Sequence, residues 1–428
     1  MAEEKFDAII VGGGLAGCVT GYLLAKAGLE TLIIERGNFC GSKNMTGGRL
    51  YAHSVEKIFP NFAEEAPVER SIVHEKISFI DEKSSVTMDY AAPEDDNNAS
   101  RSYTVLRTKF DQWLADKAEE AGVGIIPGIR VDDIITRDGK VCGVVAGGEE
   151  MEADVVVLAD GVNSILGEKL GMVSKVTPHN CAVGVKEIIQ LTKEQVNDRF
   201  SCTDKEGAAC LFAGMPSDGY MGGGFIYTNE DSISLGVVFG LHNIEKAGKS
   251  IPQMLEDFKN HPSVKPLVSG GESVEYSAHV VPEGGYNMLP KMVGDGVLLA
   301  GDAAGLCLNV GYTVRGMDLA FASGEAAANA IIAAKEKNDF SEAGLSAYTK
   351  ELDNSFVMKD LKLYKDLPEF LDNKRMFNDY PQMATGIMKG MFTVNGPSQP
   401  LRKTMMPHLK KVGFMNLLKD GFKGVKSI

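Results

Sequence analysis

The stretch that decides the fold is Phe6-Asp7-Ala8-Ile9-Ile10-Val11-Gly12-Gly13-Gly14-Leu15-Ala16-Gly17. Its apolar first half is typical of a buried strand, and the Ala- and Leu-rich residues 15–27 are typical of a helix. Between them, Gly12 permits a tight turn, Gly14 lets a pyrophosphate approach the backbone, and Gly17 lets the helix pack closely on the strand. The phosphates then meet the positive N-terminus of the helix. The stretch therefore predicts a dinucleotide-binding loop.

A second apolar run, residues 31–35, supports this prediction. It ends in Glu35, at the distance of about 20 residues where an acid binds the ribose hydroxyls. Strand, glycines, helix, strand and carboxylate thus follow one another in the order of a nucleotide-binding unit. A generic glycine-rich turn does not require that order.

Two later motifs indicate which dinucleotide is bound. Asp160-Gly161 follows the strand pattern of residues 154–159, and Gly301-Asp302 follows the strand pattern of residues 296–300. An NAD dehydrogenase needs neither motif. A flavin is covered along its whole length, so a carboxylate at a strand end can hold the ribityl chain, although an ordinary helix N-cap also explains Asp302. The segment 311–316 precedes an Ala-rich helix pattern whose N-terminus can face the pyrimidine end of the ring. These motifs predict FAD.

In this order, together with residues 106–114 (Leu-Arg-Thr-Lys-Phe-Asp-Gln-Trp-Leu), the motifs resemble flavoproteins of the para-hydroxybenzoate hydroxylase fold, including geranylgeranyl reductases. Residues 43–51, 221–225 and 305–316 are similar to the Fix C type, relatives of electron-transfer-flavoprotein:quinone oxidoreductase. The resemblance covers nearly the whole chain. It implies one FAD, electrons received from a two-subunit electron-transfer flavoprotein of Fix A and Fix B type, and delivery toward quinone.

The resemblance also implies an α/β fold with a Rossmann-like FAD-binding domain, an interleaved mixed-sheet substrate domain and a helical C-terminal region. We expect residues 1–75, 100–170 and 290–335 to form the discontinuous FAD-binding domain. Residues 175–290 are then the substrate or quinone side, and residues 336–428 the helical C-terminal region with a basic tail.

The cofactor-binding residues are predicted from the motifs, from the loop that returns over the cofactor after Glu35, and from cations expected at the phosphates. They are Gly12, Gly14, Leu15, Ala16, Gly17, Glu35, Arg36, Lys43, Gly48, Arg107, Val131, Asp160, Gly161, Gly301, Asp302 and Gly311. Surface positions for Lys43, Arg49 and Arg107 are the alternative. No catalytic acid or base is predicted, because a flavin takes and releases electrons without one. His279 is the titratable group to check near the ring, with a structural role as the simpler interpretation.

The composition excludes some functions. The formal charge of −14 over 428 residues argues against nucleic acid, whose phosphates need a basic surface. The seven cysteines are scattered, without a C-x-x-C motif or a signal peptide, which suits the cytoplasm and predicts neither a metal site nor an iron-sulfur cluster. Cys40 and Cys307 are expected near the flavin. Single-chain relatives carry a C-terminal cluster domain, so the resemblance implies a separate small ferredoxin-like subunit here.

Three segments allow more than one interpretation. Gly222-Gly223-Gly224 indicates a backbone packed against flavin, quinone or, more simply, another strand. Residues 94–98 are predicted to be an exposed loop. The tail after residue 402 is basic, and Val412, Met415, Leu418, Phe422 and Val425 share one helical face. That helix could lie on an anionic membrane at the inner face, dock a partner or cover the core.

Three classes of function follow. The first is an electron-transfer flavoprotein dehydrogenase. The second is a flavin-dependent prenyl (geranylgeranyl-type) reductase or monooxygenase, which would oxidise NAD(P)H. The third is a non-catalytic electron relay that works only within its complex.

Overall fold

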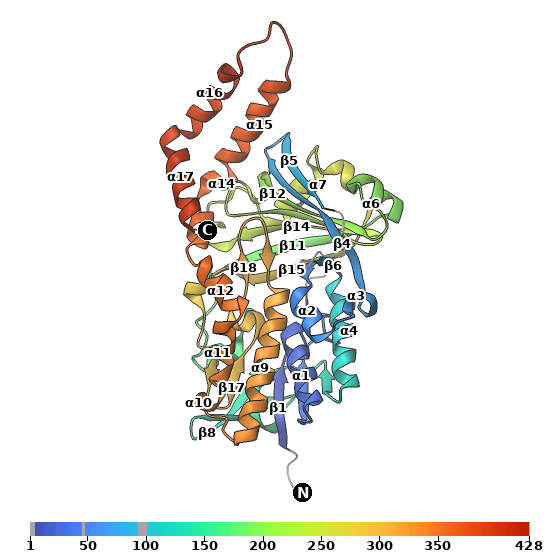
Figure 1. Cartoon of the computed structure of the whole chain (residues 1–428), viewed down its shortest axis with the longest axis vertical. Coiled ribbons are helices and arrows are strands. Elements are labelled where there is room, and N and C mark those ends of the chain that lie inside the picture. Colours follow the sequence, from blue (N-terminus) through green and yellow to red (C-terminus); the bar gives the residue numbers. More distant parts are fainter. Residues whose placement is uncertain (1–4, 45–47, 93–100, 428) are drawn as a thin grey trace.

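A computed structural model describes residues 5–44, 48–92 and 101–427. The predicted loop at residues 94–98 and residues 45–47 of the Fix C type motif lie outside these ranges. Two large sheets and a cover of helices make up the described chain (Figure 1).

The first sheet carries the nucleotide motif. Its strands lie in the order β16 (Val293–Gly294), β17 (Val297–Leu299), β10 (Glu149–Leu158), β1 (Lys5–Val11), β2 (Thr31–Glu35) and β7 (Gly124–Pro127). The hairpin of β8 (Val131–Arg137) and β9 (Lys140–Ala146) continues from β10. Ala8, Ile9 and Ile10 are completely buried, as expected for a parallel strand that is covered on both faces.

The second sheet mixes early and late parts of the chain. Its strands lie in the order β15 (Glu272–Pro282), β11 (Cys181–Gln190), β14 (Ser232–Gly240), β13 (Gly222–Thr228), β12 (Glu206–Gly214), β4 (Val68–Ile80), β6 (Ser102–Val105) and β3 (Gly48–Tyr51). β5 (Ser85–Ala91) pairs with the later part of β4, from His74 to Ile80, beyond the residues that pair with β6. Strands β3, β4 and β6 come from segments that we assigned to the FAD-binding domain, so this sheet cuts across the expected boundaries. The domain division stays a prediction.

Helices, among them α1, α4 and α9, lie along the first sheet, and the C-terminal helices extend beyond the second (Figure 1). α1 (Leu15–Lys26) and α9 (Met317–Lys337) pack closely, because a Cβ on Gly324 would lie 2.7 Å from the Ala16 carbonyl oxygen. The helices that precede α9 along the chain are α2 (His53–Ile58), α3 (Phe62–Glu65), α4 (Arg107–Glu120), α5 (Ile165–Lys169), α6 (Lys193–Phe200), α7 (Ile251–Asn260) and α8 (Lys265–Val268). Short 3-10 helices are η1 (Met215–Ser217), η2 (Leu241–Asn243), η3 (Tyr286–Met288) and η4 (Gly301–Ala304).

The C-terminal region is helical. It contains α10 (Glu342–Leu345), α11 (Ala347–Asn354), α12 (Phe356–Leu363), α13 (Leu367–Leu371), α14 (Lys374–Phe377), α15 (Asp379–Phe392), α16 (Leu401–Val412) and α17 (Phe414–Ser427). The α15–α16 pair projects from the body, and α17 returns toward it (Figure 1). Within the described ranges, no helix has both the length and the apolar character needed to cross a membrane.

The prediction that five apolar residues of the tail share one helical face was wrong for Val412. Gly413, with φ of 91°, ends α16 after Val412, which is buried. The other four predicted residues lie on α17 and are exposed, with Phe422 at 77% and Val425 at 82%. Periodicity alone does not detect the backbone break, because Gly413 preserves the spacing while it changes the helix direction.

Candidate functional site

A cavity of about 670 Å³ is lined by residues of both sheets and of the C-terminal helices. Its volume lies within the range of about 300–1,000 Å³ that is usual for small-molecule sites. One end is lined by the glycine loop after β1, and another part by Gly222, Gly223 and Gly224 of β13. Leu371 and Phe377 contribute from α13 and α14. The cavity therefore connects the nucleotide loop with the C-terminal region.

Glycine is suited to each of the three loop positions for a different structural reason. Gly12 has φ of 106°, and a Cβ there would lie 2.4 Å from the Ala159 carbonyl oxygen. A Cβ on Gly17 would lie 2.0 Å from the Gly12 carbonyl oxygen, so Gly17 permits the close packing of α1. A Cβ on Gly14, at the start of α1, would meet no atom within 4 Å. Gly14 thus leaves open space at a helix N-terminus, where a phosphate is favoured.

Glu35 is buried at the end of β2 and ties the loop together. Its carboxylate accepts hydrogen bonds from the backbone N–H of Gly13 at 2.8 Å and of Gly37 at 2.6 Å. The carboxylate has further lone pairs for ribose hydroxyls. The position and the fixed orientation suit the predicted ribose contact.

Asp160 follows β10 and lines the cavity. Its Oδ1 is buried without a hydrogen-bond partner in the described part of the chain. Burial raises the pKa of Asp160 to about 6. A buried oxygen without a partner at a cavity wall indicates a ligand that supplies a donor.

Asp302 lies in η4, at the end of β17, and also lines the cavity. Burial raises the pKa of its carboxyl group, and the nearby His279 and Arg107 oppose that shift. His279 lines the cavity from β15, and burial lowers its pKa. The carboxylate, the imidazole and the guanidinium thus converge on the middle of the cavity.

Arg107 begins α4 and is held in place by Asp111 of the same helix. The two residues form a bidentate pair, with Nε to Oδ1 at 2.7 Å and Nη2 to Oδ2 at 2.8 Å. Asn44 donates a further hydrogen bond to Asp111. This arrangement fixes the planar guanidinium at the cavity wall, where its remaining donors can reach a phosphate.

Arg49 has a different environment, although it also lines the cavity. Its guanidinium pairs with both carboxylate oxygens of Glu75, donates to Ser102 and lies over the ring of Tyr51, 4.6 Å from the centroid. The predicted alternative of a surface cation is therefore wrong for Arg49, which is held between β3 and β4.

The glycines of β13 are packed against neighbouring strands, as the simpler interpretation expected. A Cβ on Gly222 would lie 2.1 Å from the Val238 carbonyl oxygen, and one on Gly223 would lie 2.5 Å from that of Phe212. The same glycines line the cavity, so they also leave its wall flat.

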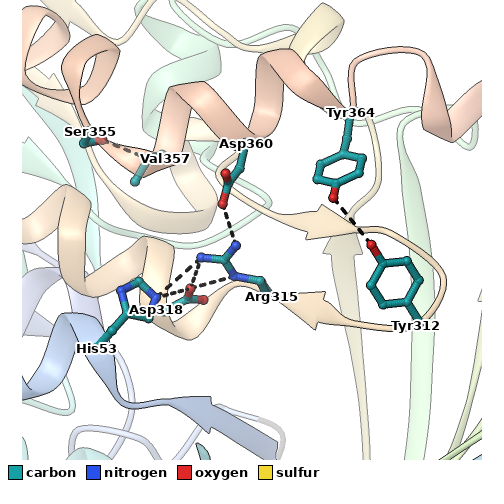
Figure 2. A network of polar contacts seen from close by, with 8 residues as sticks. All are labelled: His53, Tyr312, Arg315, Asp318, Ser355, Val357, Asp360 and Tyr364. Atoms are coloured by element: carbon teal, nitrogen blue, oxygen red, sulfur yellow. Dashed lines mark hydrogen bonds and ion pairs between the residues drawn. The ribbon is translucent and has the colours of Figure 1, made fainter. Parts of the chain in front are cut away.

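A charged network anchors the hairpin of β18 (Leu308–Asn309) and β19 (Val314–Arg315) beside the cavity (Figure 2). Arg315 donates from Nε to Oδ2 of Asp318 at 2.8 Å and from Nη1 to Oδ2 of Asp360 at 2.6 Å. His53 lies 3.1 Å from the same Asp318 oxygen. The network joins α2, α9 and α12, and so holds the N-terminus of α9 in place.

Most predicted residues line this one cavity. They are Gly12, Gly14, Leu15, Ala16, Glu35, Arg36, Lys43, Gly48, Arg107, Val131, Asp160, Gly161, Gly301, Asp302 and Gly311. Gly17 does not line it, because it is packed beneath Gly12. Cys307 lines the cavity as expected, whereas Cys40 is buried behind Gly13.

Arg315 and Glu283 are among the lining side chains that sequence reasoning missed. Arg315 lies inside the quoted segment 311–316, so the motif contained that signal. Glu283 follows β15 without a recognisable motif. No cluster of metal-ligating side chains was found among residues 5–44, 48–92 and 101–427.

The polar groups that line this cavity fit FAD. The Glu35 carboxylate can accept hydrogen bonds from ribose hydroxyls, Gly14 opens toward the helix N-terminus, and the unpartnered Asp160 oxygen and Asp302 line the same cavity. Comparison with known families agrees, since residues 5–353 match an FAD binding domain. The cofactor is therefore FAD.

The remaining comparisons concern the whole chain. Residues 367–428 match the ETF-QO/FixC family C-terminal domain. The chain is 59% identical to protein FixC of Escherichia coli O157:H7, over 99% of both chains. It is 57% identical to the probable electron transfer flavoprotein-quinone oxidoreductase YdiS of Escherichia coli strain K12, over the full length of both.

Solved structures show the same fold. A geranylgeranyl bacteriochlorophyll reductase-like protein of Thermoplasma acidophilum aligns with a TM-score of 0.74 at 21% identity, over 98% of this chain and 99% of that one. The flavin-dependent brominase Bmp2 aligns with a TM-score of 0.66 at 18% identity, over 95% and 100%. The predicted α/β flavoprotein fold is confirmed. Because the chain is 57–59% identical to FixC and YdiS over at least 99% of its length, it belongs to the FixC/electron-transfer-flavoprotein:quinone oxidoreductase family of FAD-dependent oxidoreductases.

Proposed function

We propose that the protein accepts electrons from a two-subunit electron-transfer flavoprotein and passes them through FAD toward quinone or a ferredoxin-like partner. One observation carries this proposal: the cavity that begins at the nucleotide loop ends at Leu371 and Phe377, inside the family's C-terminal domain. Residues of the family's C-terminal helices thus line the same cavity as the nucleotide loop. The name of the relative YdiS, which includes quinone as acceptor, agrees with this direction of transfer.

FAD would be held by the residues predicted from the sequence. Glu35 would bind the adenosine ribose, and Arg36 and Val131 the adenosine end. Gly12, Gly14, Leu15 and Ala16 would face the pyrophosphate together with Arg107. Asp160 and Asp302 would bind the central chain, and Lys43, Gly48 and Gly311 would surround the ring. FAD supplies the two-electron chemistry, whereas the chain orients it and excludes water.

The division into domains is part of the same proposal. The FAD-binding part comprises 1–75, 100–170 and 290–335, the quinone side 175–290, and the helical region 336–428. The second sheet would then form the wall of the cavity that covers the cofactor. The C-terminal helices would form another wall of the same cavity.

We further propose that α17 lies on the anionic inner face of a membrane, with the protein otherwise in the cytoplasm. Met415, Leu418, Phe422 and Val425 are exposed on α17. Lys419 and Lys426 lie on the same helix, in a chain of formal charge −14. An exposed apolar helix face with basic neighbours favours an anionic lipid surface.

The membrane contact is tested with vesicles. Phe422→Asp should weaken sedimentation with vesicles that contain phosphatidylglycerol, whereas purely zwitterionic vesicles should bind the unsubstituted protein weakly. Val274→Asp is the matched control, because Val274 is 55% exposed on β15, in the second sheet. Equal binding of the two variants would contradict a contact through α17.

A small ferredoxin-like iron-sulfur subunit is the proposed second partner. The cysteines of this chain are dispersed and, in the described residues, form no metal-ligating cluster. A cluster that belongs to this electron path would therefore have to be carried by another chain. Copurification of an iron-containing small subunit with the tagged full-length protein tests this proposal.

Electron transfer is tested by the flavin spectrum of the purified protein under anaerobic conditions. Reduced electron-transfer flavoprotein should bleach the flavin, a soluble quinone should restore it, and NADH should have no effect. Bleaching by NADH alone would instead support a reductase or monooxygenase. Bleaching without recovery by quinone would identify an electron relay that needs its complex.

A further inference from the structure

Glu283 is an acid in the cavity that the proposed binding of FAD does not use. It follows β15, and its backbone N–H donates to the Asn180 carbonyl oxygen at 2.9 Å. Its neighbours in the cavity wall include Met221, Pro282 and Leu371, which are apolar. No ion pair involves Glu283 in the ranges that the structure describes.

The electrostatic surroundings of Glu283 favour its neutral form. Burial raises the pKa of Glu283 to about 7, and a hydrogen bond from Asn309 opposes the shift only in part. The titratable groups around it include Cys307, Cys181 and two tyrosines, Tyr286 and Tyr364, and no cation of the described residues lowers its pKa. A carboxyl group in such a place holds a proton near neutral pH.

A second, small cavity lies directly behind Glu283. Its volume of about 20 Å³ is enough for one water molecule. Glu283, Cys307 and Asn309 are among the residues that line both cavities, so Glu283 lies in the wall that the two cavities share. Tyr364 lines the small cavity, and its hydroxyl lies 3.4 Å from that of Tyr312, which is 46% exposed (Figure 2). Glu283 and Tyr364 therefore share the wall of the small cavity, and Tyr312, the hydroxyl partner of Tyr364, is exposed to solvent.

We infer that Glu283 donates a proton to a quinone that is reduced in the main cavity. The inference rests on the proposed function. Reduction of a quinone to hydroquinone requires two electrons and two protons. With the bound flavin in its anionic reduced form, oxidation of the flavin would release both electrons and one proton. Glu283 supplies the second proton: its O–H bond breaks as an O–H bond forms at a quinone oxygen. A proton from bulk solvent then returns to the carboxylate by way of the water in the small cavity, so that this water stays neutral.

The apolar wall around Glu283 is consistent with this role. A quinone ring is apolar with two carbonyl acceptors, and it needs one convergent donor in an otherwise apolar pocket. Leu371 belongs to α13, and Phe370 of the same helix packs against Gly424 of α17. The region of the cavity around Glu283 thus adjoins the helix that we propose to contact the membrane, where quinones dissolve.

The test compares two oxidants. Glu283→Gln keeps the size of the side chain but removes the ionisable proton. After anaerobic reduction with dithionite, its oxidation by a soluble short-chain quinone should be slower by on the order of a hundredfold. Oxidation by ferrocenium, which takes electrons without protons, should be unchanged. Glu283→Asp should recover part of the quinone rate, and Glu272→Gln, an exposed acid on the same strand, is the control.

Two further measurements make the inference falsifiable. In the unsubstituted protein, the quinone rate should fall as the pH rises through about 7, because Glu283 loses its proton. Infrared titration of the flavin-free protein should show a protonated-carboxyl band that Glu283→Gln removes. An unchanged quinone rate in Glu283→Gln, equal slowing with ferrocenium, or no loss of that band would each overturn the inference about Glu283 and leave the proposed function intact. Failure of the unsubstituted protein to react with quinone at any pH, while ferrocenium oxidises it, would refute the proposed function as well.

Discussion

Gly14→Asp tests the proposed pyrophosphate site most directly. A Cβ at this position points into open space, with no atom within 4 Å. The backbone of Gly14 has φ of −83°, which any residue adopts without strain. Gly14 is the N-cap of α1 and has no side chain to cap the helix. An aspartate there can accept a hydrogen bond from the first turn and should stabilise the flavin-free protein by a few tenths to about 1 kcal/mol.

The same carboxylate should oppose FAD. A negative charge about 4 Å from a phosphate is unfavourable by about 4 kcal/mol at an effective dielectric constant of about 20. Since about 1.4 kcal/mol corresponds to a tenfold change in Kd, the affinity for FAD should fall about a thousandfold. The variant should therefore purify colourless but folded.

Gly14→Asn is the matched control, because it has the same shape and capping ability without the charge. FAD is titrated into each flavin-free variant by the quenching of its fluorescence, and thermal unfolding is followed in parallel. The difference in Kd between the two variants isolates the charge. Equal Kd values for Asp and Asn, or full flavin content in Gly14→Asp, would refute the placement of phosphate at the start of α1.

Three other substitutions address carboxylates, two in the cavity and one in the C-terminal helices. Asp302→Ala removes a charged acceptor and should weaken FAD binding by about ten- to a hundredfold, so an unchanged Kd in the same titration would contradict the ribityl contact. Asp160→Asn should stabilise the flavin-free protein by about 2–3 kcal/mol at pH 8. The folded-state pKa of Asp160, about 6, exceeds its ordinary value of 3.8, so the ionised group destabilises the fold, and the gain should vanish near pH 4. Calorimetry at both pH values measures it, and an equal gain at both would exclude titration as the cause. Asp420→Asn breaks the pair with Arg375 (2.6 Å) and should cost on the order of 1 kcal/mol. The pKa of Asp420 is lowered to about 2, so in the unsubstituted protein this stabilisation is present above about pH 4 and disappears toward pH 2. The rate of proteolysis of the tail measures the stability that Asp420→Asn loses. Equal resistance of the variant and the unsubstituted protein at pH 7 would argue against a stabilising Asp420–Arg375 pair.

The nucleotide half of the fold was predictable because its constraints are local. The turn after β1 needs Gly12 for its positive φ, and the closeness of α1 needs Gly17, so the sequence records both directly. Glu35 and Asp160 each end a buried strand of one parallel sheet. Carboxyl ends of parallel strands meet at one edge, and the two acids therefore reach the same cavity.

The strand pairings of the second sheet could not be predicted from the sequence, because they are non-local. β4 pairs in parallel with β12, with Ser71 opposite Glu206, and no turn signal links strands so far apart. The role of Glu283 was missed for a related reason. Its burial depends on helices α12 and α13, which follow about 75 residues later, and a single acid after a strand has no local pattern.

The contact between the two sheets has a consequence for cofactor binding. The first sheet supplies Glu35 and the glycine loop, but the wall opposite is formed by β13 and by His279 of β15. A flavin bound in this cavity would therefore touch both sheets and add a link between two layers whose strands are interleaved in sequence. Any ligand that binds only the folded state stabilises it. Destabilising changes confined to the second sheet should then lower flavin retention, even where they leave every residue of the glycine loop in place. A change in the α15–α16 pair, whose residues do not line the described cavity, should lack this effect. The comparison separates loss of the cavity wall from general loss of stability.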